Sequence, residues 1–199
     1  MEIKTKFDVC EPLTRDIIDE QLELRCKLHE FNHARPDDEA TQQRLLSEML
    51  GTYQGAIVIA PFHCDIGRNI HFGEGGFINS DCVILDMAPV RLGDYVMLGP
   101  KVQLLATTHP VDLAERVLPY ICGNEIVIGD NVWIGGGSIV LPGVTIGDRS
   151  VIGAGSVVTK DIPSDVVAAG NPCRVIKPIE HGELPDYEEL AQIYAAIGL

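Results

Sequence analysis

The stretch IVIGDNVWIGGGSIVLPGVTIGDRSVIGAGSVVTKDIP, residues 126–163, defines the expected fold of this 199-residue chain. Apolar residues recur in it at every sixth position, and glycine often follows the repeat residue. Because strand side chains alternate between two faces, a six-residue unit gives a short strand plus a corner, with the repeat residue pointing inward. Three such units close a coil of about eighteen residues, so the pattern predicts a stacked parallel β-helix. The repeat residues are Ile128, Ile134, Val140, Ile146, Ile152 and Val158.

The same six-residue period extends toward the N-terminus, with interruptions. The earlier repeat residues are Ile66, Phe72, Ile78 and Ile84 and then, after a slip of two residues, Leu92, Leu98 and Leu104. On an eighteen-residue coil, Cys64 and Cys82 are expected to stack in adjacent coils as reduced core residues. Residues 105–125 have no period at all. A long insertion on a rigid scaffold is a candidate functional loop.

Helical patterns flank the repeats. Apolar residues at helical spacing predict a helix over residues 16–31 and a second one that begins near Pro36 and ends at Gly51. Residues 186–197 read as a short amphipathic helix. We therefore expect a mainly β chain with three parts: an N-terminal helical cap at 1–56, a β-helix domain at 57–179 and a C-terminal helical extension at 180–199.

Composition argues against several functions. The formal net charge is -14, and an acidic surface repels the phosphates of nucleic acids. No apolar run reaches the length of a membrane span, and the N-terminus has no signal-peptide core, so we expect a cytoplasmic protein that does not contact a membrane. Six cysteines without a CxxC pair are expected to be reduced thiols rather than a disulfide framework or a zinc ribbon.

His109, in TTHPVD within the insertion, is the candidate for proton transfer. A neutral imidazole is suited to remove a proton from a hydroxyl group near neutral pH. The alternative is a loop histidine without a role. A metal site is not expected, because the spacing of His63 and His71 matches no compact motif and no carboxylate cluster completes it.

Two further features indicate a binding surface. Trp133 lies between two inward residues, so its indole should point outward, and the glycines that follow would let a ligand approach the backbone. Corner flexibility is the alternative for those glycines. Lys160, Arg174 and Lys177 gather near the end of the repeats and could hold phosphates, the alternative being solvated surface charge. Asn79 and Asp65 lie near corners, where a purely structural role is also possible.

Several motifs together resemble one known family. The segments NIHFGEGGFINSDCVILD, TTHPVD, NVWIGG and AAGNPCRVI, with HEFNHARP near the N-terminus, are similar to the maltose/galactoside O-acetyltransferases of the hexapeptide-repeat superfamily. The resemblance implies a left-handed β-helix, a homotrimer and an acetyl-CoA-dependent transfer of an acetyl group to a hydroxyl of a sugar or similar acceptor. It also implies direct transfer in a ternary complex, with the active site between subunits.

The resemblance assigns roles to individual residues. His109 matches the catalytic histidine, and Asp65 and Asn79 match positions that face the acceptor. One departure concerns Met87, because galactoside-type members have a second acidic residue there, directly after the position of Asp86. The loop after His109 also differs from the usual sugar-enzyme loop. The matching cofactor positions are Trp133, Gly136, Ala154, Thr159, Lys160, Arg174 and Lys177.

Two other functions use the same fold. A non-catalytic trimeric scaffold would keep the coils without the chemistry, since fold does not imply function. A γ-class carbonic anhydrase would need three histidines that meet a zinc ion across a subunit interface. Only His109 lies in a suitable part of the repeats.

Overall fold

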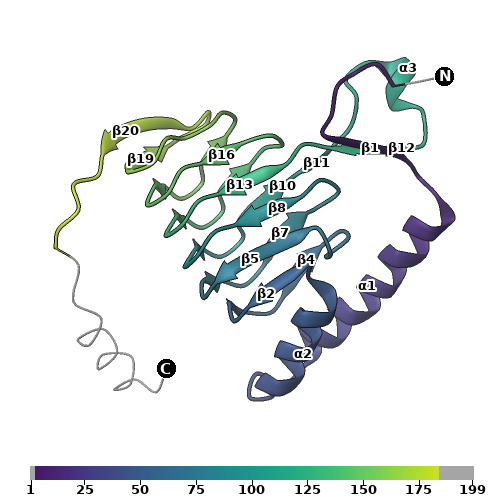
Figure 1. Ribbon diagram of the computed structural model, residues 1–199, viewed down its shortest axis with the longest axis horizontal. Coiled ribbons are helices and arrows are strands. Elements are labelled where there is room, and N and C mark those ends of the chain that lie inside the picture. Colours follow the sequence, from purple (N-terminus) through teal and green to yellow (C-terminus); the bar gives the residue numbers. More distant parts are fainter. Residues whose placement is uncertain (1–2, 184–199) are drawn as a thin grey trace.

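A computed structural model describes residues 3–183 of the chain, and the helix expected at 186–197 lies outside this range. The chain winds into a parallel β-helix that two helices cap at its N-terminal end (Figure 1). The structure confirms the expected fold class, a mainly β chain with an N-terminal helical region. Within the described residues, no helix is long and apolar enough to cross a membrane.

The cap consists of α1 (Arg15–His33) and α2 (Glu39–Met49). The side chain of Thr14 accepts a hydrogen bond from the Ile17 amide, and that of Asp38 accepts one from the Thr41 amide, so each helix has a polar N-cap. The second helix ends at Met49, and its C-cap is Leu50 rather than the expected Gly51. All the buried residues of the two helices except Ile17 join the main core; these residues are Ile17, Leu24, Leu28, Phe31, Leu45, Leu46 and Met49.

Three sheets form the sides of the β-helix, and the strands of each stack in order along its axis. Sheet one contains β4 (Phe62–Cys64), β7 (Cys82–Leu85), β10 (Gln103–Leu105), β15 (Ile139–Val140) and β18 (Val157–Val158). Sheet two contains β2 (Thr52–Gln54), β5 (Ile70–Glu74), β8 (Val90–Leu92), β13 (Ile126–Ile128) and β16 (Thr145–Ile146). Sheet three contains β3 (Ile57–Val58), β6 (Phe77–Ile78), β9 (Met97–Leu98), β14 (Trp133–Ile134), β17 (Val151–Ile152), β19 (Val166–Ala169) and β20 (Arg174–Pro178).

Apart from the coil that carries the insertion and a last coil of sixteen residues, in which Ile152 pairs with Ala168, the coils have two lengths. In the second half, Ile134 pairs with Ile152, which is the expected eighteen-residue step. In the first half, Ile57 pairs with Phe77, a step of twenty residues. The expected stacking of Cys64 on Cys82 is therefore wrong, since Cys64 pairs with Ile84. Cys82 lies in the core as expected, and both are free thiols.

The extra residues all lie at one corner, where sheet one passes into sheet two. Residues 65–69 follow β4 and residues 86–89 follow β7, and the insertion that follows β10 leaves from the same place. We call this edge the expanded corner. Ile66 belongs to it rather than to the repeat, because it packs with Ile17 and Met87 outside the main core.

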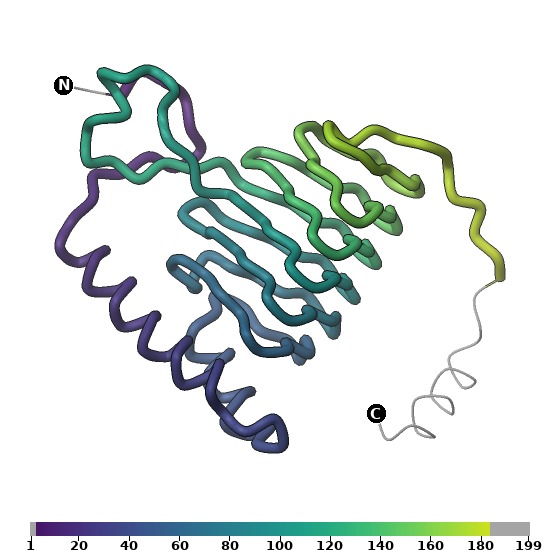
Figure 2. The backbone as a smooth tube through the Cα atoms, turned by 180° about the vertical axis from the view of Figure 1, so that it is seen from behind, coloured from purple at the N-terminus to yellow at the C-terminus, as the bar shows by residue number. Residues whose placement is uncertain are grey.

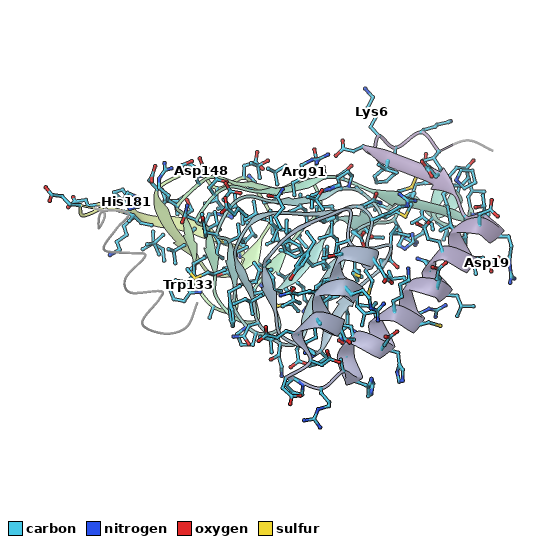
Figure 3. The ribbon with its side chains drawn as sticks, turned by 60° about the horizontal axis from the view of Figure 1, so that its bottom comes forward. Lys6, Asp19, Arg91, Trp133, Asp148 and His181 are labelled. Atoms are coloured by element: carbon cyan, nitrogen blue, oxygen red, sulfur yellow. A yellow bond between two sulfur atoms is a disulfide. The ribbon has the colours of Figure 1, made fainter. Side chains whose placement is uncertain are left out.

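The insertion forms an arm that projects from the β-helix (Figures 1 and 2). It contains β11 (Thr107–Thr108), α3 (Leu113–Arg116) and β12 (Tyr120–Gly123), and the N-terminal strand β1 (Val9–Pro12) pairs with β12. This register sets Cys10 opposite Cys122, with Cα atoms 4.0 Å apart, and the two form a disulfide (Figure 3). The expectation of six reduced cysteines is wrong for this pair, because a partner 112 residues away leaves no local motif.

Candidate functional site

The expanded corner brings polar groups from three segments together. Asp65 is half-buried there, and Gln21 of α1 donates a hydrogen bond to its carboxylate over 2.8 Å. Burial raises the pKa of Asp65, while hydrogen bonds from Gln21 and Thr107 oppose the increase. A hollow of about 150 Å³ lies beside this carboxylate, lined also by Arg25 and Cys64. The lining offers both hydrogen-bond donors and acceptors, which suits a small polar ligand.

A second carboxylate lies behind the first. Asp86 is fully buried, and its oxygens accept hydrogen bonds from the backbone amides of Asp65, Ile66 and Asn69, at 3.1, 2.8 and 3.3 Å. Burial raises the pKa of Asp86, and the backbone hydrogen bonds oppose this increase. Its neighbour Met87 is also buried. The sequence alone did not identify Asp86, Thr107 or Gln21 as parts of the site, since none of them stands out from the repeat pattern.

The thiol nearest to this corner is not an activated nucleophile. Burial and the neighbouring carboxylates of Asp86 and Asp65 raise the pKa of Cys64 well above its usual value. The group therefore stays protonated near neutral pH, whereas a nucleophilic cysteine needs a lowered pKa.

His109 follows directly after β11, where the arm leaves the expanded corner, and its side chain is exposed. The strand is anchored on one side, since Thr108 pairs with Cys122 of β12. Thr107, two residues earlier, accepts a hydrogen bond from the Met87 amide over 3.1 Å. Hydrogen bonds thus hold the backbone just before His109, and the imidazole faces solvent, where a ligand can reach it.

A different corner, where sheet three passes into sheet one, bears the next group of predicted residues. Asn79 follows β6, Gly136 follows β14 and Ala154 follows β17. The backbone is closely stacked there: a Cβ on Gly99 would lie 2.5 Å from the Gly136 amide nitrogen. We call this edge the glycine corner. Because its coils leave little room for side chains, a ligand could lie close along its backbone.

Asn79 is half-buried, and its side-chain oxygen accepts a hydrogen bond from the Ser80 amide over 2.8 Å. The left-handed backbone conformation that asparagine tolerates occurs instead at Asp81, with a φ of 62°. The side-chain amide group of Asn79 therefore remains able to donate to a ligand.

Trp133 points outward as predicted, with half of its surface exposed, while Val132 and Ile134 are buried (Figure 3). It belongs to a ladder of outward apolar side chains on sheet three. Ile57, Phe77, Met97 and Trp133 occupy successive positions of this ladder, and they are 45%, 36%, 46% and 50% exposed. Contiguous exposed apolar surface of this kind is typical of an interface.

The remaining predicted cofactor residues lie in three places. Thr159 and Lys160 follow β18 on the expanded corner. Arg174 begins β20 and pairs with Ala169 near the glycine corner, and Lys177 pairs with Val167 on sheet three. All four are exposed. The two corners are the two ends of sheet one, about six residues of extended chain or roughly 20 Å apart.

Comparisons with known proteins agree with this architecture. The family model of the maltose acetyltransferase hexapeptide capping motif matches residues 12–55, and the bacterial transferase hexapeptide model, with six repeats, matches residues 125–160. The galactoside O-acetyltransferase of Escherichia coli (strain K12) is 42% identical over 186 residues, which cover 91% of this chain and 90% of the relative.

Two solved structures are similar along most of their length. A maltose O-acetyltransferase from Clostridium difficile 630 has a TM-score of 0.82 at 45% identity, with 84% of this chain and 90% of that chain covered. A hexapeptide-repeat acetyltransferase from Vibrio cholerae O1 biovar eltor, complexed with acetyl coenzyme A, has a TM-score of 0.79 at 36% identity, covering 84% and 91%.

Proposed function

Since this chain belongs to the maltose/galactoside O-acetyltransferase family, we propose that it transfers the acetyl group of acetyl-CoA to a hydroxyl group of a sugar or sugar-like acceptor. The observation that supports this most directly is the exposed His109 directly after β11, the strand whose Thr107 interacts with the Asp65 carboxylate that lines the polar hollow. A base next to a site that suits hydroxyl groups is the arrangement that acyl transfer to an alcohol requires.

The proposed reaction is a direct transfer in a ternary complex. His109 removes the proton of the acceptor hydroxyl, and the oxygen attacks the thioester carbonyl of acetyl-CoA. The carbon–sulfur bond then breaks, and the CoA thiolate takes up the proton, so that the products are the acetyl ester and free CoA. The raised pKa of Cys64, the thiol beside the site, is consistent with a pathway without an acyl-enzyme.

In this proposal acetyl-CoA lies along the β-helix. Trp133, Gly136 and Ala154 would contact its extended arm, with Thr159, Lys160 and Arg174 at the phosphate end and Lys177 nearby. The closely stacked backbone at the glycine corner supports such a track. Asp65 and Asn79 would bind the acceptor through its hydroxyl groups.

The proposed active form is a homotrimer with its sites between subunits. Asn79, Gly136 and Arg174 lie at the glycine corner, whereas Asp65, His109 and Lys160 lie at the expanded corner. A separation of roughly 20 Å is too large for one acetyl group to meet both sets within a single chain. A neighbouring copy would complete the site if its glycine corner lay against the expanded corner of the first copy. The apolar ladder on sheet three offers a surface for this association.

The competing functions are a scaffold without catalysis and a zinc-dependent carbonic anhydrase. The cytoplasmic location expected from the sequence stays a prediction. The test is a screen of purified protein with acetyl-CoA and a panel of sugars, glycosides, sugar alcohols and amino sugars, in which released CoA thiol is measured. We expect release only with some acceptors, matched by acetylated product in mass spectra.

Two results would contradict the proposal. The absence of acceptor-dependent CoA release across the panel would favour the scaffold. One zinc ion per subunit together with hydration of carbon dioxide would favour the anhydrase.

A further inference from the structure

Asp86 occupies an energetically demanding position that the proposed reaction does not use directly. Its carboxylate is fully buried. The arginine beside it in the fold, Arg68, bonds Glu20 instead, over 2.6 Å. A buried carboxylate without a cationic partner is costly unless hydrogen bonds replace its lost water. The position therefore indicates a role that an apolar residue could not fill.

The hydrogen bonds of Asp86 all hold one turn. The backbone amides of Asp65, Ile66 and Asn69 donate to its two oxygens. In return, the Asn69 side chain donates to the backbone carbonyl oxygens of Asp86 and Met87, over 2.9 and 3.3 Å. These contacts join the two stacked coils at the expanded corner, and they set the backbone conformation from which the Asp65 side chain projects.

Thr107 connects the same turn to the strand that leads to His109. Its hydroxyl oxygen accepts the hydrogen bond of the Met87 amide, and its side chain interacts with the Asp65 carboxylate in the sense that lowers the pKa of that group. One hydroxyl can do both, because it has one donor and two acceptor sites. β11 ends at Thr108, so His109 is the next residue of the chain.

We propose that Asp86 and Thr107 are positioning residues, which hold the Asp65 carboxylate in register with His109 so that an acceptor bound by Asp65 presents its hydroxyl group to the imidazole. The inference rests on the proposed function. Neither residue needs to touch the acceptor, since each acts through the turn and through Asp65. Small errors in such a geometry reduce rates strongly, because acyl transfer needs the reacting atoms aligned at close range.

The experiment is a double-mutant cycle that measures steady-state kinetics with maltose, methyl β-galactoside or another acceptor of the panel, whichever supports the highest turnover. Asp86→Asn keeps the shape of the side chain but turns an amide group toward backbone amides that need an acceptor. We expect Asp86→Asn and Asp65→Asn each to raise the acceptor KM about tenfold, with the KM for acetyl-CoA changed by less than about twofold. The double variant should resemble Asp65→Asn alone.

Asp94→Asn is the matched control. Asp94 also accepts a backbone hydrogen bond from the preceding coil, from the Glu74 amide over 2.7 Å, but it follows β8 at the corner between sheets two and three. The substitution should cost stability through the same kind of contact and leave both KM values at the wild-type level.

A second pair of variants tests the connection to β11. Thr107→Val removes the hydroxyl group at nearly constant shape, and Thr107→Ser retains it. The acceptor KM should rise about tenfold in Thr107→Val and return toward the wild-type value in Thr107→Ser. Equal KM values in the two variants would overturn the proposal, including in the case that Asp86→Asn does not fold.

The outcomes also separate this inference from the proposed function. A folded Asp86→Asn protein with an unchanged acceptor KM would overturn the positioning role. The positioning role would also be overturned if the two substitutions multiplied their effects on the acceptor KM in the double variant, because Asp86 would then act independently of Asp65. If the wild-type protein releases no CoA with any acceptor of the panel, the sugar acetyltransferase function fails, and the positioning role fails with it.

Discussion

At the scale of single residues, the surroundings of the side chains differ between the parts of the site. His109 is exposed, Asp65 is half-buried and Asp86 has no exposed surface. Burial raises the pKa values of both carboxyl groups, but hydrogen-bond donors surround each of them and favour the ionised form. The exposed group is the one proposed to exchange protons, and the buried groups are the ones proposed to bind or to position.

His109→Ala should reduce acetyl transfer at least ~100-fold, because general base catalysis typically supplies ~10²–10⁴ in rate. Acetyl-CoA binding should stay nearly intact, since the imidazole is not among the proposed cofactor contacts. Steady-state rates and calorimetric binding of CoA check the two statements. His29→Ala, at an exposed histidine of α1, is the control, and near-normal turnover in His109→Ala would remove the assigned role.

Lys160→Ala and Arg174→Ala should each weaken CoA binding about tenfold, because each removes a charge that could bond a phosphate. Titration calorimetry with CoA measures this. Lys27→Ala is a matched control, since Lys27 bonds Glu23 on α1. Unchanged dissociation constants in both test variants would count against the proposed cofactor track.

At the scale of elements, coil length determines what each corner can do. The eighteen-residue coils of the second half have tight corners, and the twenty-residue coils of the first half place two additional residues at the expanded corner. They lengthen the turn of residues 65–69, which bears Asp65. Asp65 and His109 thus lie at the edge where the repeat is relaxed, while the glycine corner keeps the regular stacking that stabilises the fold.

Exposed ion pairs also join successive coils at their corners. Arg149 forms two hydrogen bonds with Asp165, of 2.7 and 2.8 Å, and this arginine and His181 lower the pKa of Asp165 to about 2. Because the folded-state pKa lies below the unfolded value, the pair stabilises the protein above about pH 4, and the contribution is lost as the pH falls toward 2.

Asp165→Asn should therefore lower the melting temperature at pH 6 by a small amount, as is typical of an exposed pair. The difference from the wild type should shrink as the pH falls to about 2, because the wild-type carboxylate becomes protonated there. Differential scanning fluorimetry across this range measures the difference. A gap that stays constant with pH would show that the charge of Asp165 is not responsible.

At the scale of the whole molecule, exposed apolar side chains and exposed carboxylates form separate rows. The apolar ladder runs along sheet three, with Trp133 on the side opposite to Arg91 and Asp148 (Figure 3). The polar side includes a row of carboxylates, in which Asp94, Asp130 and Asp148 accept backbone hydrogen bonds from successive coils. Like charges in that row oppose contact with a second acidic copy at the corner between sheets two and three, whereas the apolar ladder favours self-association through the face of sheet three.

Met97→Glu should convert the proposed trimer into monomers, because it buries a charge without a partner in the interface. Light scattering after size-exclusion chromatography measures the mass. Leu22→Glu is the control, since Leu22 is similarly exposed, at 52% against 46% for Met97, but lies on α1. Loss of activity together with the trimer would support a shared site, and a trimer that survives Met97→Glu would exclude sheet three as its contact.

The local periodicity of the sequence was sufficient to predict the β-helix, the two helices of the cap and the outward direction of Trp133. Period two in strands and the helical period are properties of the backbone within a few residues, so they can be read without knowledge of distant contacts. The arm was likewise indicated by the loss of that period between residues 105 and 125.

Other features depend on segments far apart in the chain. The twenty-residue step pairs Cys64 with Ile84, and the pairing of β1 with β12 joins residues more than a hundred positions apart. The register of such pairs follows from the packing of whole coils and from the path of the arm, which no local pattern encodes. For the same reason, only the folded chain brings Gln21, Asp65, Asp86 and Thr107 together at one corner beside His109.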